Sequence, residues 1–119
     1  MLESAGFRIQ ERKFDFFFGQ ITSTPRNQAR SLQNLEDLAR LGIRVETQGR
    51  DRLMQIFAAG LTASETSPRR EDEYGVTIGR TVQVESEAAK GGIEIFYLYR
   101  DGDLSSIPEV TTIIPRIYR

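Results

Sequence analysis

The chain has 119 residues, a formal net charge of −1 at pH 7, and neither cysteine nor histidine. The missing residue types exclude disulfides, thiolate catalysis and any acid–base or metal chemistry that depends on histidine. The near-zero net charge gives no overall attraction to nucleic acids or membranes, and no apolar run approaches the roughly 20 residues of a membrane-spanning helix. The length suits a single domain with its own core.

The first 18 residues are predicted to form an extended apolar arm or a short strand, and residues 19–119 a single α+β domain. The first segment ends in an apolar run from Phe14 to Phe18, in which Asp15 is the one polar residue. So dense a run of phenylalanine also fits a surface that contacts another polypeptide. A homo-oligomer formed through Phe14–Phe18 is therefore one of the partner predictions.

Residues 25–41 are predicted to form the first helix. Thr24 is a favourable N-cap, and Pro25 at the first helical position gives up only an N–H that has no partner there. Leucines then recur at steps of three and four residues, which draws one apolar stripe, and Gly42 is suited to end the helix. A second helix is predicted between Thr47, as its cap, and Gly60.

The polar face of the first helix carries the candidate RNA-binding residues. No acidic residue occurs between Ile21 and Leu35, although acidic residues slightly outnumber basic ones in the whole chain. A helix amino terminus with nearby guanidinium groups favours anions. The alternative is an ordinary solvated face. The candidates are Arg26, Asn27, Arg30 and Asn34.

After a polar loop over residues 62–73, the apolar period changes from 3.6 to 2 residues, which predicts strands. The predicted strands cover residues 76–84, 93–100 and 110–114, and Pro115 is expected to end the last one. The middle strand is nearly all apolar, so we expect it to be covered on both faces. Because the helices precede the strands, we predict an α+β fold, with two N-terminal helices packed on one face of a twisted antiparallel sheet of three to four strands.

Arg80 is the first candidate catalytic residue. Its parity in the strand matches that of four branched aliphatic residues, so its side chain is expected on their side of the sheet. An arginine among core residues is unfavourable unless it is paired or that side opens into a cleft. One interpretation is a phosphate-binding or transition-state-stabilising arginine. The alternative is an arginine that reaches solvent or pairs with a carboxylate.

Tyr97 and Thr112 are the other two candidate catalytic residues. Tyr97 shares a strand face with Tyr99 and two isoleucines, which fits either a core tyrosine or a phenol near a scissile phosphate. Thr111 and Thr112 are adjacent in a strand, so only one of them is expected to face a cleft shared with Arg80.

Three stretches of the chain form a recognisable pattern: Phe18-Gly19-Gln20-Ile21-Thr22, the helix from Arg26-Asn27 through Arg30-Ser31 and Gln33-Asn34 to Leu41-Gly42-Ile43 with Gly49-Arg50 after it, and Asp101-Gly102-Asp103-Leu104 followed by Val110–Pro115. This pattern resembles the C-terminal toxin modules of bacterial polymorphic toxins, which end Rhs-repeat and filamentous-haemagglutinin-like proteins. The resemblance covers about residues 18–115 and points to the barnase–EndoU–colicin–RelE-like ribonucleases. It implies a metal-independent endoribonuclease without a cofactor, which binds RNA on the open face of its sheet.

In this group of ribonucleases the 2′-hydroxyl of RNA attacks the adjacent phosphate, so the enzyme supplies no nucleophile. The resemblance then implies that Arg80 clamps the phosphate, Thr112 donates a hydrogen bond to it and Tyr97 handles a proton. Arg26 and Arg30 would steer or hold the RNA backbone. The family pattern has a histidine where this chain has Arg26, which leaves either a different acid–base arrangement or an inactive copy.

The resemblance also implies a bacterial toxin domain that acts on RNA in the cytoplasm after delivery as part of a larger secreted protein. Its partner would be a cognate immunity protein, and no membrane association is expected. Two other functions stay open at this point. One is a non-enzymatic module that forms homo-oligomers or binds partners, and the other is an immunity protein, which the slight acidity of the chain favours.

Overall fold

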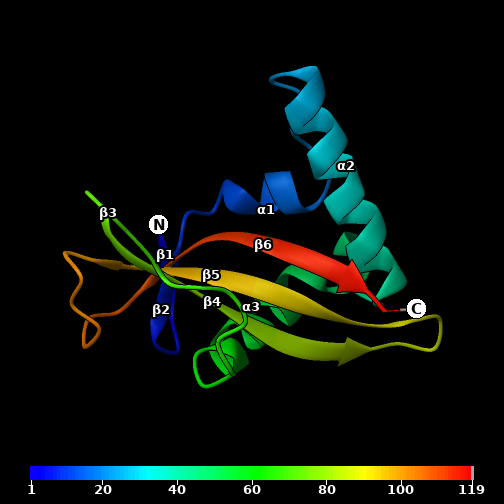
Figure 1. The fold of residues 1–119 in the computed structure, drawn as a ribbon. Helices are drawn as coiled ribbons and strands as arrows, with labels where there is room; N and C mark the ends of the chain where they lie inside the picture. The colour runs from blue at the N-terminus through cyan, green and yellow to red at the C-terminus, as the bar shows by residue number, and fades with distance from the viewer. Residues whose placement is uncertain (119) are drawn as a thin grey trace.

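A computed structural model of the chain describes residues 1–118, which form a mixed six-stranded sheet with three α-helices (Figure 1). The strand order is β1-β2-β6-β5-β4-β3, and β2 pairs with β6 in parallel whereas the other neighbours are antiparallel. The elements are β1 Leu2–Ser4, β2 Phe7–Ile9, α1 Lys13–Phe17, α2 Pro25–Arg40, the 3-10 turn η1 Val45–Thr47, α3 Gly49–Gly60, β3 Arg70–Asp72, β4 Gly75–Glu85, β5 Lys90–Arg100 and β6 Glu109–Ile117.

The fold is α+β, but the predicted arrangement of two N-terminal helices on an antiparallel sheet of three to four strands is wrong. The sheet has six strands and is mixed, and there are three helices. The strands β1, β2 and β3 have three residues each, which is too short for a period-2 pattern to be recognised. The parallel contact joins Arg8 to Glu109 and Ile9 to Val110, a pairing between opposite ends of the chain that no local pattern indicates.

Residues 13–17, inside the segment expected to be an extended arm or a strand, form the short helix α1. Phe14 and Phe17 are three residues apart, so the helix places both rings on one face, and both are buried. Their rings lie 6.5 and 6.2 Å from the Phe57 ring of α3. The phenylalanine run therefore contributes to the core of its own chain. The division of the chain at residue 18 stays a prediction.

The helix α2 begins and ends where the sequence predicts. The Thr24 hydroxyl accepts a hydrogen bond from the Asn27 backbone N–H at 3.1 Å, and Gly42 has a φ of 80° just after the helix. The helix α3 begins two residues after Thr47, because residues 45–47 form a 3-10 turn. Gln48, with a φ of 64°, precedes α3 and makes no side-chain cap.

The three long strands β4, β5 and β6 form the centre of the sheet. The strand β6 continues through Pro115 to Ile117, so the prediction that proline ends it is wrong. β2 pairs only with Glu109 and Val110 of β6, which leaves the rest of that side of β6 as an edge. An edge tolerates proline because no neighbouring strand needs its missing N–H.

The helices and the core lie on one face of the sheet. In Figure 1 the helix α3 lies behind β4 and β5, while α1 and α2 lie beside β6, and the amino-terminal half of α2 extends beyond the sheet. Side chains that alternate along β5 face this core, including Ile93, Ile95 and Tyr97, each fully buried. Every residue of β5 from Gly91 to Tyr99 is buried except the half-buried Phe96, which confirms the expected cover of both faces except at Phe96. No helix among residues 1–118 lies in front of the sheet. Nor is any helix there both long and apolar enough to span a bilayer.

Candidate functional site

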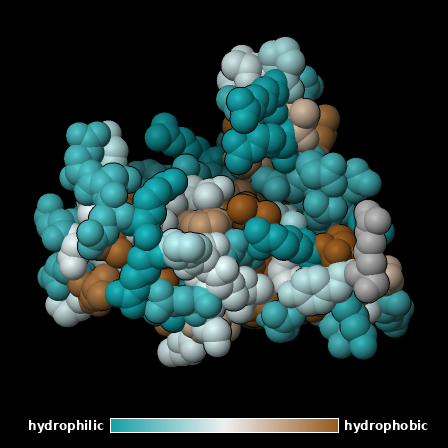
Figure 2. Space-filling model, in the orientation of Figure 1, coloured by the Kyte–Doolittle hydropathy of each residue, from teal (hydrophilic) through white to brown (hydrophobic). Residues whose placement is uncertain are grey.

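The face of the sheet opposite α3, called the open face from here on, carries the candidate site. Strand register places the following residues on this face: Thr77, Gly79 and Thr81 of β4, Glu94, Phe96 and Leu98 of β5, and Glu109, Thr112, Ile114 and Arg116 of β6. Polar and apolar side chains alternate over this face, which is the side of the molecule shown in Figure 2. Such a surface offers both apolar contact and hydrogen-bonding groups to a ligand.

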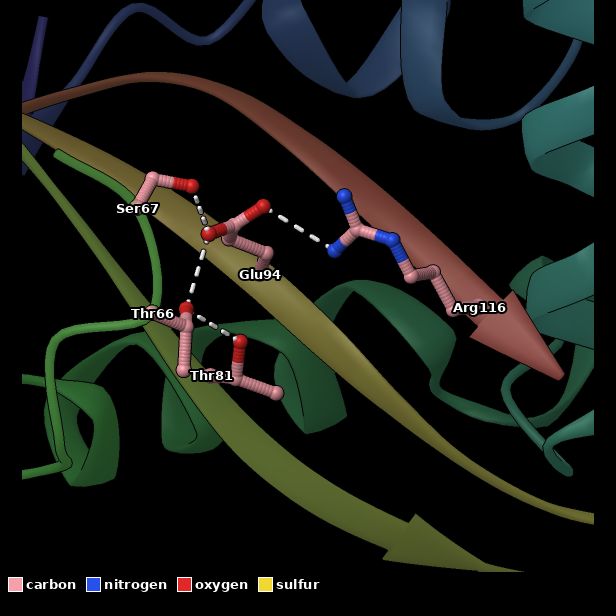
Figure 3. Close-up of polar contacts among 5 residues, drawn as sticks. All are labelled: Thr66, Ser67, Thr81, Glu94 and Arg116. Atoms are coloured by element: carbon pink, nitrogen blue, oxygen red, sulfur yellow. Dashed lines mark hydrogen bonds and ion pairs between the residues drawn. The ribbon is translucent and has the colours of Figure 1, made fainter. Parts of the chain in front are cut away.

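Glu94 lies at the centre of a polar network on the open face (Figure 3). Its side chain is only 2% exposed, and its Oε1 accepts a hydrogen bond from Arg116 Nη1 at 2.9 Å. Its Oε2 accepts hydrogen bonds from the Thr66 hydroxyl at 2.7 Å and the Ser67 hydroxyl at 2.5 Å. The Thr66 hydroxyl also lies 2.7 Å from the Thr81 hydroxyl. The network therefore joins β4, β5, β6 and the loop between α3 and β3.

The network keeps Glu94 ionised at neutral pH. Burial alone would raise the pKa of this carboxyl, but hydrogen bonds from Ser67, Thr66 and Arg116 outweigh it and lower the pKa below the ordinary value of 4.5. A buried anion that is paired with a guanidinium and bonded to two hydroxyls can accept a proton from a further hydroxyl at neutral pH.

Arg116 joins this buried carboxylate to the solvent. One guanidinium nitrogen binds Glu94, whereas the side chain as a whole is 51% exposed. A guanidinium carries five N–H donors in a planar fork, so a half-exposed one keeps donors free for an anion. Because its hydrogen bond to Glu94 fixes the orientation of the guanidinium, the remaining N–H groups of Arg116 point in a defined direction.

The loop between α3 and β3 supplies the hydroxyls that cover Glu94. It docks along β4, where the Thr66 N–H donates to the Gly79 carbonyl at 2.9 Å and the Thr81 N–H to the Ser64 carbonyl at 3.4 Å. Gly79 leaves room beside the carboxylate, since a Cβ there would lie 3.1 Å from Glu94 Oε2. The sequence analysis missed Glu94, although a single carboxylate within an apolar strand is a recognisable signal.

Next to this network, a cavity of about 430 Å³ opens between α1, the amino-terminal half of α2 and β6. We call it the basic cavity. Three cations and one carboxylate line it together with apolar and threonine side chains: Arg12, Lys13, Arg30, Asp15, Phe16, Phe17, Ile21, Thr111 and Thr112. Thr111 and Thr112 both line it because a bulge between Phe96 and Tyr97 in the β5–β6 register makes Thr111 the extra residue. Arg80 does not line this cavity, so the expectation that at most one of the two threonines faces a cleft shared with Arg80 stays a prediction.

The structure places the predicted site residues in two groups. Thr112 lies on the open face and also lines the basic cavity. Arg30 lines the same cavity, and its guanidinium lies 5.7 Å from the Phe16 ring. Arg80 and Tyr97 lie on the opposite face, toward the helices, because their partners across the β4–β5 pair are core residues. The structure thus brings Arg30 and Thr112 together, and the sheet separates them from Arg80 and Tyr97.

Arg80 and Tyr97 each bond to a backbone carbonyl. Arg80 Nη1 donates to the Ala63 carbonyl at 2.6 Å, and its Nε is buried with no hydrogen-bond partner among residues 1–118. The Tyr97 hydroxyl donates to the Phe57 carbonyl of α3 at 2.6 Å, and burial raises the pKa of this fully buried phenol. Their predicted catalytic roles are untested and stay predictions.

The remaining candidates lie along α2. Arg26 is exposed, and Asn27 and Asn34 are half-buried. The Asn27 side-chain amide donates to the Ser23 hydroxyl at 3.2 Å, within the turn that precedes the helix. Arg26 and Asn27 lie in the first turn of α2, in the half of the helix that extends beyond the sheet in Figure 1, whereas Asn34 lies in its carboxyl-terminal half. Their role in RNA binding is likewise a prediction.

We expect Arg80→Ala to lower the stability of the fold more than it lowers RNA cleavage on the open face. The variant loses a charge-assisted hydrogen bond to the Ala63 carbonyl, so the free energy of unfolding should fall by about 1–3 kcal/mol. Thermal denaturation measures this loss, and cleavage of RNA well below the midpoint measures function. Cleavage abolished at unchanged stability would instead support the role predicted for Arg80 from the sequence.

Within residues 1–118, no cluster of three or more acidic side chains is arranged to hold a metal ion. The chemistry that the described residues offer is that of an ionised carboxylate, guanidinium groups and hydroxyls. Together they can bind an oxyanion, orient it and accept a proton from a nearby hydroxyl.

The fold and the site define a small α+β domain with a mixed sheet and a carboxylate–arginine pair on its open face. The chain is similar in structure to a chain of a contact-dependent growth inhibition toxin–immunity protein complex from Klebsiella pneumoniae 342. The TM-score is 0.73 at 21% sequence identity, and the match covers 91% of this chain and 98% of that chain. At this identity the likeness establishes the shared fold. No protein-family model and no curated protein matches the sequence.

Proposed function

We propose that the chain is a toxin domain that cleaves RNA on the open face of its sheet, with Glu94 and Arg116 as the central residues. The observation that carries this proposal is a buried, ionised carboxylate bonded to a half-exposed arginine on that face. The resemblance to polymorphic toxin modules supports it. So does the shared fold with a chain from a complex of a toxin and its immunity protein.

In the proposed reaction, Arg116 binds the scissile phosphate and Glu94 accepts the proton of the 2′-hydroxyl. The 2′-oxygen forms a bond to phosphorus, the bond from phosphorus to the 5′-oxygen breaks, and a 2′,3′-cyclic phosphate results. The leaving 5′-oxygen takes a proton from water, and the hydroxide that remains is neutralised by the proton that Glu94 releases. Because Thr66 and Ser67 cover the carboxylate, the 2′-hydroxyl must replace one of these hydroxyls as a donor to Glu94.

The site needs no histidine, because the carboxylate is ionised at neutral pH and the guanidinium stays charged throughout. The guanidinium stabilises the negative charge that accumulates on the phosphate as the 2′-oxygen attacks. Thr112 is close enough along the same strand face to donate a hydrogen bond to the RNA. Arg26, Asn27, Arg30 and Asn34 of α2 would hold the RNA backbone beside the sheet.

The proposed biological setting follows from the structural neighbour. That chain comes from a complex that contains both a toxin and an immunity protein. If this chain is the toxin of such a pair, a cognate immunity protein would bind it and block its open face. A larger secreted protein would deliver the domain to a recipient cell, where it reaches RNA in the cytoplasm.

We expect the purified chain to degrade total RNA in the presence of EDTA, because the proposed reaction uses no metal. The cleaved ends should carry 2′,3′-cyclic phosphates, which labelling with and without prior phosphatase and kinase treatment identifies. A DNA of the same sequence, which lacks the 2′-hydroxyl, is the matched control and should stay intact. Intact RNA after prolonged incubation would contradict the proposal.

A second candidate function is an immunity protein, since the complex of the structural neighbour also contains one. An immunity protein would leave RNA intact and would protect cells from a toxin expressed beside it. A homo-oligomer through Phe14–Phe18 is less favoured, because Phe14, Phe17 and Phe18 are each no more than 5% exposed in the chain itself. Growth arrest after expression of the chain alone separates a toxin from an immunity protein.

A further inference from the structure

We infer that the basic cavity between α1, α2 and β6 binds a second phosphate of the RNA, a few nucleotides from the phosphate that Arg116 holds. This inference rests on the proposed function. It adds a binding site that includes Arg12 and Lys13, two residues of the α1 segment that the sequence analysis did not single out. The occupant is a phosphodiester group of a single-stranded polynucleotide.

The charge of the cavity is the first observation. Three cations line it against one carboxylate, Asp15, in a chain whose formal net charge is −1. None of Arg12, Lys13 and Arg30 forms an ion pair within residues 1–118, whereas seven other basic residues there do. Three unpaired cations around one hollow repel one another unless an anion occupies it.

The shape of the cavity is the second observation. Its volume of about 430 Å³ lies within the ~300–1,000 Å³ of typical ligand pockets. The Arg30 guanidinium lies 5.7 Å from the centre of the Phe16 ring, a cation–π contact between two residues that line the cavity. Thr112 adds a hydroxyl group at the β6 wall, whereas the Thr111 hydroxyl donates to the Phe96 carbonyl at 3.3 Å.

The position of the cavity is the third observation. Thr112 lines it and also lies on the open face, on the same side of β6 as Arg116. The two residues are four positions apart, which is about 13 Å at ~3.3 Å per residue of strand. A polynucleotide that lies along β6 can therefore place one phosphate at Arg116 and another, a few nucleotides away, in the cavity. Phe96 lies opposite Thr112, and Ile114 lies between the two points on the same side of β6.

The test is the binding of a fluorescently labelled 2′-O-methyl 12-mer, which the proposed reaction cannot cleave, measured by anisotropy at several salt concentrations. The double variant Arg12→Gln, Lys13→Gln should bind on the order of tenfold more weakly at low salt. Each phosphate contact contributes about 0.7 to the slope of log affinity against log salt on a single strand, so loss of the one phosphate in the cavity should make the slope shallower by about 0.7. The double variant Arg40→Gln, Arg52→Gln makes the same change of net charge at the carboxyl end of α2 and on α3, and should bind as the unmodified chain does.

An unchanged affinity and salt slope in the Arg12, Lys13 variant would overturn the inference, as would the same loss in the control variant or no binding by the unmodified chain. The outcome is separable from that of the proposed function. A chain that cleaves RNA but shows an unchanged slope in the variant retains the function and loses this site. A chain that binds through Arg12 and Lys13 but cleaves no RNA retains the site and loses the function.

Discussion

Glu94→Gln should lower the rate of RNA cleavage by about 10²–10⁴-fold, the usual contribution of a positioned proton acceptor. The amide keeps the volume of the side chain, and its oxygen still accepts hydrogen bonds from Thr66 or Ser67. Single-turnover cleavage at saturating RNA measures the chemical step, and circular dichroism confirms that the variant is folded. A rate within the range of the unmodified chain would remove Glu94 from the mechanism.

The matched control is Glu109→Gln. Glu109 also lies on the open face and pairs with an arginine, since Arg100 Nη2 lies 3.1 Å from its Oε1. This pair is separate from the network around Glu94, so its loss should leave the cleavage rate unchanged. Equal losses in the two variants would mean that the charge of the open face matters and the identity of the carboxylate does not.

The ionisation of Glu94 also predicts how stability depends on pH. The pKa of this carboxyl is lowered in the folded chain, so ionisation stabilises the fold above the ordinary value of 4.5, and this contribution is lost as the pH falls through the lower folded value. Cleavage should likewise decline only at pH values below 4.5. In Glu94→Gln the acidic loss of stability from this carboxyl should disappear, which melting curves over an acidic pH series can measure without any RNA.

Arg116→Ala should lower the rate of RNA cleavage by about 10²–10³-fold, because the developing charge on the phosphate loses its guanidinium. The loss should fall mainly on kcat, since Arg116 is proposed to stabilise the transition state more than the bound substrate. Arg116→Lys should recover only part of the rate, because an ammonium cannot bind Glu94 and a phosphate through one planar fork. Steady-state kinetics on a defined oligoribonucleotide gives both parameters.

The control for Arg116 is Arg100→Ala, which removes the arginine of the second ion pair on the same face. Its side chain is 59% exposed, compared with 51% for Arg116, so both substitutions remove a similarly exposed guanidinium. Arg116→Ala leaves the buried Glu94 with its two hydroxyl partners alone, and some loss of stability is expected. Rates are therefore compared at a temperature where both variants are folded. A comparable loss of cleavage in Arg100→Ala would contradict a specific role for Arg116.

Local patterns in the sequence predicted the elements whose signals are local. The α2 helix follows from Thr24, Pro25 and a repeated leucine stripe, because capping and helical periodicity involve residues within a few positions of one another. The β4 and β5 strands follow from alternating or continuous apolar residues. The helix α1 is different: its Phe14 and Phe17 are spaced for a helix, but five residues are too few for that spacing to outweigh an extended interpretation.

The candidate site depended on contacts that the sequence does not display. Glu94 receives its partners from Thr66, Ser67 and Arg116, which lie 22 to 28 positions away along the chain. Strand parity placed Arg80 correctly on the side of the branched aliphatic residues. It could not show that this side is the one the helices cover, so the residue predicted to bind the phosphate lies on the face opposite our proposed site.

By itself, the sequence determined the α+β class, the limits of α2 and the exclusion of histidine and cysteine chemistry. Only the tertiary structure decided which face of the sheet is open, which cation reaches it, and that a buried carboxylate lies at its centre. The physical reason is the range of the interactions involved. Capping and periodicity act between neighbours in the chain, whereas the pKa of Glu94 and the direction of Arg116 depend on segments that only folding brings together.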